Sequence, residues 1–357
     1  MVGDCMLARE KTYTVHVGDV AIGGGAPVVV QSMTNTPTTD VEATLSQIAR
    51  LRDAGCDVIR VAVPTRKAVA PFGEICAASP IPVIADVHFD HQIAIDAIRH
   101  GAAGARINPG NIGSLERVDR VAEAAGEAGV PIRIGVNAGS LDPEVASRAD
   151  LDIPERLAAS AVGFVAHLEG QGFSDVVVSA KAHDVPTTIK AYELLSREIP
   201  QVPLHLGVTE AGTMLQGTVK SAVGLGTLLS EGIGDTLRVS LTADPEQEVR
   251  VGWEIISSLG LRRRGPELVS CPTCGRTQVG LIPIAEEVGR ALEGIDAPIT
   301  VAVMGCVVNG PGEASGADIG VACGKGEGVI FRKGKVERTV PEDQIASALL
   351  EEIRAGL

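Results

Sequence analysis

Aromatic side chains are scarce in this chain of 357 residues, because Phe, Trp and Tyr make up 2% of it while hydrophobic residues make up 45%. The core must therefore be built mainly from Val, Ile, Leu and Ala. The β-branched members of that set favour strands. The length exceeds that of one small domain and suits a large domain joined to a small one.

Long basic tracts and long apolar runs are also lacking. The longest basic run is 262–264 and the formal net charge is −14, so we expect no nucleic-acid partner. We expect no membrane span, since no stretch of about 18 apolar residues is present, and the first residues lack the apolar core of a secretory signal. These features favour a cytoplasmic protein whose seven cysteines are reduced thiols or metal ligands rather than a disulfide framework.

Eight short β-branched runs alternate with helical segments between about residues 28 and 260. In the first helical segment, Val41, Leu45, Ile48 and Leu51 recur at the spacing of one helix face. Eight strand–helix units in this length predict a (β/α)8 TIM barrel, with a doubly wound open sheet as the alternative. The runs begin at Val28, Val58, Ile81, Gly104, Ile132, Asp175, Pro203 and Thr236.

The alternating pattern has a distinct start and a distinct end. A hairpin that turns at Gly18 and Asp19 precedes it, and we expect this hairpin to cap the N-terminal end of the barrel. The charged segment LRRRGPELVS breaks the pattern, so we predict a substrate-binding TIM-barrel domain over residues 1–260 and a small α+β domain over residues 261–357. The second domain should finish with a hairpin over 328–340 and a helix from about Glu342.

Basic side chains recur at the ends of five predicted strands, where a barrel forms its active site. Because guanidinium groups match phosphate oxygens, this arrangement predicts a polyanion-binding mouth, most simply for a ligand with two phosphates. The alternative is that each cation pairs with a neighbouring acid or lies among the outer helices. The five cations are Arg60, Arg106, Arg133, Lys181 and Arg238, and the polar positions beside them include Asp86, His88, Asn137 and Ser240.

The second domain carries cysteines with the spacing of metal ligands. Cys271 and Cys274 form a C-x-x-C pair, and Cys306 and Cys323 follow. All seven histidines precede this domain, so a zinc site and an iron–sulfur site are the two interpretations, and spacing does not separate them. Cys323 would complete a closed site, whereas Glu313 suits a site that gives up one position to substrate; Glu313 could equally begin a helix.

The order of several motifs resembles the 4-hydroxy-3-methylbut-2-enyl diphosphate synthase family in its two-domain bacterial form. CPTCGR and GCVVNGPGEA carry the resemblance in the second domain, and QSMTNT, DVIRVAVP, ADVHFD, RINPGN, RIGVNAGSL and LGVTEAG carry it in the barrel. The likeness runs from about His16 to Val340.

The resemblance implies an activity and its cofactor. The reaction is the reductive ring opening and dehydroxylation of 2-C-methyl-D-erythritol 2,4-cyclodiphosphate to 4-hydroxy-3-methylbut-2-enyl diphosphate in the non-mevalonate isoprenoid pathway. A 4Fe-4S cluster would receive electrons from reduced flavodoxin or ferredoxin. The resemblance also implies a head-to-tail homodimer, in which the cluster domain of one chain closes over the barrel of the other.

The resemblance also implies roles for individual residues. Cys271, Cys274, Cys306 and Glu313 match the cluster ligands, with Glu313 displaced by substrate during catalysis. The five cations match the diphosphate contacts. Further residues in matching phrases are the substrate contacts Asn137, Ser240 and Asn309 and the candidate catalytic residues His88 and Glu210. Glu210 is a candidate proton donor, or otherwise a loop acid paired with an arginine.

Two other classes of function fit parts of the pattern. A zinc-stapled barrel could bind a phosphorylated metabolite without redox chemistry. A pterin-type methyltransferase barrel is suggested by Asp and Asn at the strand ends, but it gives the cysteine site no clear role.

Overall fold

The computed structural model describes residues 9–139, 141–293, 295–306, 314 and 316–356. The chain divides into two compact units, of which one ends at Arg262 and the other begins at Arg263. Asn309 and Glu313, which the sequence marks as candidate site residues, lie outside the described residues.

The first unit is a closed barrel of eight parallel strands, which confirms the predicted (β/α)8 fold. Each predicted run contains one strand, and the strands pair in the order β8-β7-β6-β5-β4-β3-β10-β9. A bridge between Val178 and Leu204 closes the ring. The strands are β3 (Val29–Met33), β4 (Val58–Ala62), β5 (Val83–Val87), β6 (Gly104–Ile107), β7 (Ile132–Asn137), β8 (Val176–Lys181), β9 (His205–Leu206) and β10 (Thr236–Leu237).

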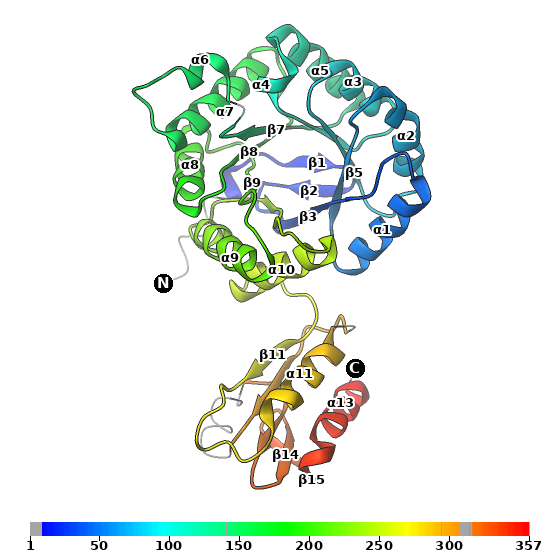
Figure 1. Cartoon of the computed structure of the whole chain (residues 1–357), viewed down its shortest axis with the longest axis vertical. Coiled ribbons are helices and arrows are strands. Elements are labelled where there is room, and N and C mark those ends of the chain that lie inside the picture. The colour runs from blue at the N-terminus through cyan, green and yellow to red at the C-terminus, as the bar shows by residue number, and fades with distance from the viewer. Residues whose placement is uncertain (1–8, 140, 294, 307–313, 315, 357) are drawn as a thin grey trace. The chain divides into compact units, whose positions relative to one another are not determined.

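Helices surround the barrel as an outer ring (Figure 1). Their N-termini fall where capping aspartates stand, because Asp40, Asp90, Asp152 and Asp184 each accept a hydrogen bond from a backbone N–H of the first turn. The ring contains α1 (Val41–Asp53), α2 (Val69–Ala78), α3 (His91–Arg99), α5 (Leu115–Ala128), α7 (Ile153–Gly170), α8 (Val185–Glu198), α9 (Met214–Ser230) and α10 (Pro245–Ser258). Two short helices, α4 (Pro109–Ile112) and α6 (Pro143–Ala146), lie in the connections.

The predicted hairpin is present and lies across the amino-terminal end of the barrel (Figure 1). It consists of β1 (Val15–Val17) and β2 (Val20–Ile22), and Gly18 takes a positive φ of 60° at the turn. Its apolar side chains pack against residues near the starts of barrel strands. This cluster contains Val15, Val17, Ile22, Val29, Val58, Ile84 and Val177. Apolar side chains therefore fill the amino-terminal end of the barrel, and its polar side chains lie toward the carboxyl-terminal end.

In its described residues, the second unit is a five-stranded mixed sheet with two α-helices. Strands β11, β12 and β13 are parallel, and β13, β14 and β15 are antiparallel. The predicted terminal hairpin (β14–β15) and helix are confirmed, since a 3-10 turn from Glu342 leads into α13. The elements are β11 (Glu267–Ser270), α11 (Leu281–Leu292), β12 (Thr300–Met304), β13 (Ile319–Cys323), β14 (Glu327–Arg332), β15 (Lys335–Pro341) and α13 (Ile345–Ala355).

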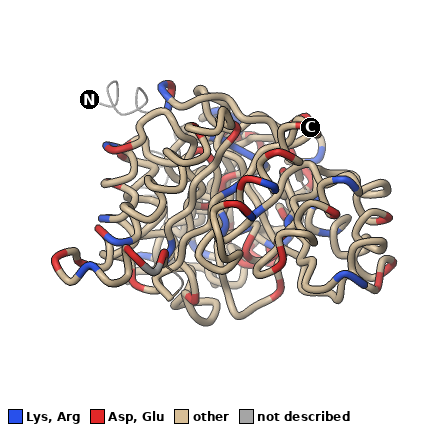
Figure 2. The backbone as a smooth tube through the Cα atoms, turned by 90° about the horizontal axis from the view of Figure 1, so that it is seen from above, with Lys and Arg blue, Asp and Glu red and all other residues tan. Residues whose placement is uncertain are grey.

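Lys and Arg residues are interspersed with Asp and Glu along the backbone rather than gathered in separate blocks (Figure 2). Among the helices of the described residues, none combines the length and the apolar character needed to cross a membrane.

One buried hydroxyl supports the closing seam of the barrel. Tyr192 in α8 is fully buried, donates a hydrogen bond to the carbonyl oxygen of His205 at 2.5 Å and accepts one from the backbone N–H of Ala180 at 3.3 Å. The hydroxyl thus links β8 to β9, the two edges that a single bridge joins.

We expect Tyr192→Phe to lower the free energy of unfolding by about 1–3 kcal/mol, because it leaves buried backbone groups without their partner. The chain has two tyrosines, and Tyr13 is a matched control whose hydroxyl meets Glu169 at 3.0 Å in an exposed contact. Tyr13→Phe should change the unfolding free energy by less than about 0.5 kcal/mol. Denaturant titrations of both variants make the comparison, and equal midpoints would exclude a role for the Tyr192 hydroxyl at the seam.

Candidate functional site

The five predicted cations come together at the carboxyl ends of the barrel strands. Arg60, Arg106, Arg133 and Lys181 lie on β4, β6, β7 and β8, and Arg238 directly follows β10. Lys181 is buried, and burial followed by the charges of Arg133, Arg60, Arg238 and Arg106 lowers its pKa well below the ordinary lysine value. The charge coupling of Lys181 to all four arginines shows that one cluster contains all five.

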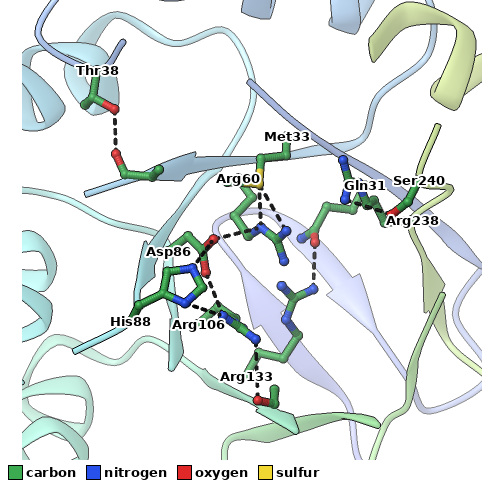
Figure 3. Close-up of polar contacts among 12 residues, drawn as sticks. Gln31, Met33, Thr38, Arg60, Asp86, His88, Arg106, Arg133, Arg238 and Ser240 are labelled. Carbon is green, nitrogen blue, oxygen red and sulfur yellow. Dashed lines mark hydrogen bonds and ion pairs between the residues drawn. The ribbon is translucent and has the colours of Figure 1, made fainter. Parts of the chain in front are cut away.

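Asp86 is the central counterion of this cluster (Figure 3). It is 3% exposed, and its carboxylate lies 3.6 Å from Nε of Arg60 and 3.3 Å from Nη1 of Arg106. The ring nitrogen Nε2 of His88 lies 3.4 Å from the same carboxylate. Burial alone would raise the pKa of Asp86, but Arg60, His88 and Arg106 together hold it well below its usual range. Asp86 therefore stays ionised at any working pH.

Strand β3 supplies two further contacts that hold cations in place (Figure 3). Oε1 of Gln31 accepts a hydrogen bond from Nη1 of Arg133 at 2.7 Å. The sulfur of Met33 lies 3.3 Å from Nε and 3.1 Å from Nη2 of Arg60. Burial, and then the neighbouring Arg60 and Arg106, lower the pKa of the Arg133 guanidinium well below its ordinary value. The charged state of Arg133 is thus costly in the free protein.

Arg238 has its own buried partner. Its Nη2 lies 3.1 Å from both carboxylate oxygens of Glu248 in α10, and its Nη1 donates to the hydroxyl of Ser240 at 2.8 Å. Burial raises the pKa of Glu248, and Arg238 opposes that shift. Ser240 therefore orients Arg238 in the free protein, in addition to being the predicted substrate contact.

Positive charge exceeds negative charge within this cluster. The carboxylates that pair with it among the described residues are Asp86 and Glu248, against five cations. Gly135 and Gly207 lie where an added Cβ would collide with the side chains of Arg106 and Lys181. Close packing on glycine and an excess of positive charge make the barrel mouth a site for an anion with several oxygens.

The remaining predicted barrel residues lie at the same end but are held less tightly. Asn137 ends β7 directly opposite Lys181 in the neighbouring strand. Glu210 follows β9, is exposed and takes a left-handed backbone conformation with φ of 53°, and it makes no hydrogen bond or ion pair with the other described residues. The proposed pairing of Glu210 with an arginine is therefore not present in this part of the chain.

Sequence reasoning missed the residues that hold the cations. Gln31, Met33 and Glu248 were not singled out, although Gln31 and Met33 alternate on β3 as inward positions do. Gly135 and Gly207 carried a usable signal, since a glycine inside a predicted strand often marks the close approach of another group. Nothing local to Glu248 marks it as the partner of Arg238.

The candidate metal ligands lie at the carboxyl edge of the parallel strands of the second unit. Cys271 follows β11 directly, and Cys306 lies two residues beyond β12, the adjacent strand. The backbone N–H of Gly305 donates to the sulfur of Cys271 at 3.2 Å. Cys274 is exposed, and hydrogen bonds from the backbone and side chain of Arg276 lower its pKa.

Cys323 lies in the apolar core of the second unit, at the end of the strand that pairs with β12. It is the last residue of β13, is 0% exposed and packs among the side chains of α11 and α13. Burial raises the pKa of its thiol to about 12. The charge of Cys271 contributes to the same shift in pKa, after burial.

The donor set fits a thiolate-bound metal centre in its chemistry. Cys271, Cys274 and Cys306 are soft ligands at one edge of the sheet, and a backbone N–H directed at the Cys271 sulfur is a contact that stabilises thiolates. Within the described ranges, no three Cys, His, Asp or Glu side chains are arranged to hold a metal ion. Because Glu313 lies outside those ranges, its part in the site stays a prediction.

Both units match models of one protein family. Residues 12–253 match the GcpE TIM-barrel domain, and residues 267–355 match the GcpE protein C-terminal domain. A relative from Geobacter sulfurreducens, named 4-hydroxy-3-methylbut-2-en-1-yl diphosphate synthase (flavodoxin), is 56% identical over 97% of this chain and 98% of its own length. A relative of the same name from Caldanaerobacter subterraneus is 54% identical over 97% of each chain.

Solved structures with low sequence identity also match this chain. A dihydropteroate synthase from Coxiella burnetii in complex with pteroic acid has a TM-score of 0.51 and 11% identity, and the match covers 70% of this chain and 98% of that one. At this identity the likeness concerns the fold only, and it agrees with a TIM barrel in the first unit.

We expect Asp86→Asn to lower the free energy of unfolding by about 3 kcal/mol at neutral pH, because it leaves two buried guanidinium groups without their counterion. Since the native pKa of Asp86 is depressed, its stabilising effect is complete above the unfolded pKa of about 4 and is lost as the pH falls toward the native value. The difference in unfolding free energy between the unaltered protein and the variant should therefore be constant from pH 5 to 7 and become smaller below about pH 4.

Asp150→Asn is the control for this measurement, since Asp150 pairs with Arg148 on the surface, where both side chains are exposed. Chemical denaturation across pH 3.5–7 compares the two variants. A deficit for Asp86→Asn that is small, or that grows toward acid pH, would contradict the assignment of Asp86 as a buried ionised counterion.

Proposed function

Because this chain belongs to the GcpE family, we propose that it has the activity named for its curated relatives, 4-hydroxy-3-methylbut-2-en-1-yl diphosphate synthase (flavodoxin). It is an iron–sulfur oxidoreductase of the non-mevalonate isoprenoid pathway. A two-electron reduction opens the ring of 2-C-methyl-D-erythritol 2,4-cyclodiphosphate, and one oxygen atom leaves as water. The observation in the structure that carries the proposal is the five-cation cluster at the carboxyl ends of the strands, whose excess positive charge suits a diphosphate.

The cations have two tasks in this reaction. Arg60, Arg106, Arg133, Lys181 and Arg238 bind the diphosphate and fix the position of the sugar carbon chain. When the ring opens, a phosphate oxygen is released from carbon and gains negative charge. Cations that are already in place stabilise that charge without reorganising. Asp86 and Glu248 keep three of the arginines in position before substrate arrives.

The polar residues at the rim are proposed to contact the rest of the substrate. Asn137 and Ser240 lie beside Lys181 and Arg238 and would donate to or accept from the diphosphate or the hydroxyl groups. Asn309 is proposed as a further contact from the second unit. A departing oxygen must gain protons to leave as water, so an acid is required; Glu210 stays our candidate proton donor, with His88, held by Asp86, as the second candidate.

Cys271, Cys274 and Cys306 would hold a 4Fe-4S cluster, and Glu313 would be its fourth, exchangeable ligand. Such a cluster supplies electrons one at a time and a Lewis-acidic iron. We leave Cys323 out of the proposed ligand set, and its burial in the core of the second unit supports that choice. The proposed electron donor is reduced flavodoxin, which appears in the names of the relatives, or reduced ferredoxin.

The quaternary structure and the location are also proposals. The candidate substrate site belongs to one unit and the candidate cluster ligands belong to the other. A head-to-tail homodimer would bring the cluster domain of one chain to the barrel of its partner. The cytoplasmic location stays a prediction, and we expect the cysteines to be reduced there.

Protein purified without oxygen should contain about four irons and four acid-labile sulfides per chain and turn over the cyclodiphosphate with a low-potential reductant. Cys306→Ser should lose most of this iron, whereas Cys323→Ala should retain it. Glu313→Ala should keep most of the iron but lose turnover by about 100-fold or more, since Lewis-acid contact is worth several kcal/mol.

Two results would contradict these assignments. A colourless protein with one zinc per chain would favour the zinc-stapled alternative over the iron–sulfur enzyme. Loss of iron in Cys323→Ala, in a variant that stays folded by circular dichroism, would place Cys323 among the ligands.

Shared active sites can be tested by mixing two inactive chains. One chain carries Cys306→Ser, and the other carries Arg106→Ala together with Arg238→Ala. In a head-to-tail dimer each heterodimer holds one intact site, so refolded mixtures should regain activity that neither homodimer has. Verified heterodimers without activity would show that each site is built within one chain.

A further inference from the structure

A small cavity lies beneath the cation cluster, inside the barrel. Its volume is ≈ 20 Å³, and its lining includes Gln31, Arg133, His205 and Thr236 together with Val17 and Ile22 of the hairpin. Measured as the space open to the centre of a water molecule, a cavity needs roughly 10–15 Å³ to hold one water. That water needs two to four polar partners. Both conditions are met here.

Three nitrogen atoms of the lining residues lack partners. Nε and Nη2 of Arg133 and Nε2 of His205 are buried and make no hydrogen bond with the described residues. Arg133 is 5% exposed and His205 is 0% exposed, so bulk water does not satisfy them. A buried polar nitrogen left unpaired costs about 1–3 kcal/mol, and such groups in native proteins are normally paired with protein or ordered water.

The protonation state of His205 decides which partner it needs. Burial, and then the charges of Arg133, Lys181, Arg60 and Arg238, lower the pKa of His205 well below its ordinary value, so the imidazole is neutral. A neutral imidazole has one donor nitrogen and one acceptor nitrogen. Nδ1 lies 3.3 Å from the hydroxyl of Thr236. In the tautomer that we assign, Nδ1–H donates to the Thr236 hydroxyl and Nε2 is the acceptor.

An acceptor is what the inner side of Arg133 lacks. A guanidinium group only donates, and Gln31 satisfies Nη1 alone. No direct hydrogen bond joins Nε2 of His205 to Arg133 in this part of the structure. A water in the cavity that both residues line can accept from Arg133 and donate to Nε2 of His205.

We propose that His205 is a positioning residue for the diphosphate site. Through one buried water, His205 holds the Arg133 guanidinium on the side that faces the amino-terminal end of the barrel. Gln31 and the water then fix Arg133 on two sides. Thr236 orients the imidazole ring, and Tyr192 fixes the backbone of His205 through its hydroxyl. Arg133 is thereby ordered before substrate binds, so less conformational entropy is lost on binding. The inference rests on the proposed function in that its kinetic test uses the cyclodiphosphate.

Two amide variants separate the two nitrogens of His205. In His205→Gln the amide reaches the position of Nε2, and in His205→Asn it reaches only the position of Nδ1. We expect His205→Asn to raise KM for the cyclodiphosphate tenfold or more with kcat within about threefold, as for the loss of an interaction that binds substrate and transition state equally. His205→Gln should restore KM to near the value of the unaltered protein.

A merely structural role for His205 predicts a different result. Both variants would then lose thermal stability to a similar degree, with KM unchanged in each, and that outcome would overturn the proposal. If the unaltered chain failed to turn over the cyclodiphosphate at all, the proposed function would fail, but the structural part of the inference would still be tested as follows.

A crystal structure of the unaltered full chain at about 1.2 Å resolution provides a readout that needs neither activity nor a variant. We expect one ordered water within 3.2 Å of both Nε2 of His205 and Nε or Nη2 of Arg133, the upper limit for such hydrogen bonds. An empty cavity, or a direct contact between the two side chains, would exclude the water bridge.

Discussion

The concentration of positive charge inside the barrel is the constraint on which the rest of the structure depends. Five cations share the site with two buried carboxylates, Asp86 and Glu248. Removing a charge from water costs several kcal/mol even after the protein relaxes, and two carboxylates do not offset that cost for five cations. The aliphatic core and the hairpin that fills the barrel from below must therefore supply the stability. An anionic ligand that binds the cations offsets part of their desolvation cost. The affinity for that ligand is therefore linked to the instability of the unliganded site.

The scaffold meets this constraint by fixing the cations individually before a ligand arrives. Gln31 and Met33 project from one strand to Arg133 and Arg60, and Glu248 reaches Arg238 from a helix outside the barrel. Glycines replace side chains where Arg106 and Lys181 need room. Each contact reduces the number of rotamers open to a long side chain, and the charges are then aligned without further reorganisation. The same packing explains why so many of the residues in this site are buried while they remain charged.

Local patterns predicted the elements of this fold better than they predicted its contacts. The eight strands, the hairpin at Gly18 and the final helix followed from periodicity and turn residues, because those signals are contained in short segments. The inward cations followed from strand alternation. The partners did not, since Gln31 and Arg133 stand 102 residues apart and meet only when the barrel closes. The alternative role of Glu210, a loop acid paired with an arginine, is not seen among the described residues, where Glu210 is exposed and takes a left-handed backbone conformation.

Parallel strands give both units the same kind of functional edge. In the barrel the cations gather at the carboxyl ends of the strands, and in the second unit Cys271 and Cys306 follow the carboxyl ends of β11 and β12. Residues just beyond a strand can reach a ligand, whereas a residue within a central strand is committed to one face of the sheet. Cys323 ends β13, the next parallel strand of the same sheet, and its side chain lies in the core of the second unit, against which Cys271 also packs. Glu313 lies outside the described residues, so its place in a ligand set at this edge stays a prediction.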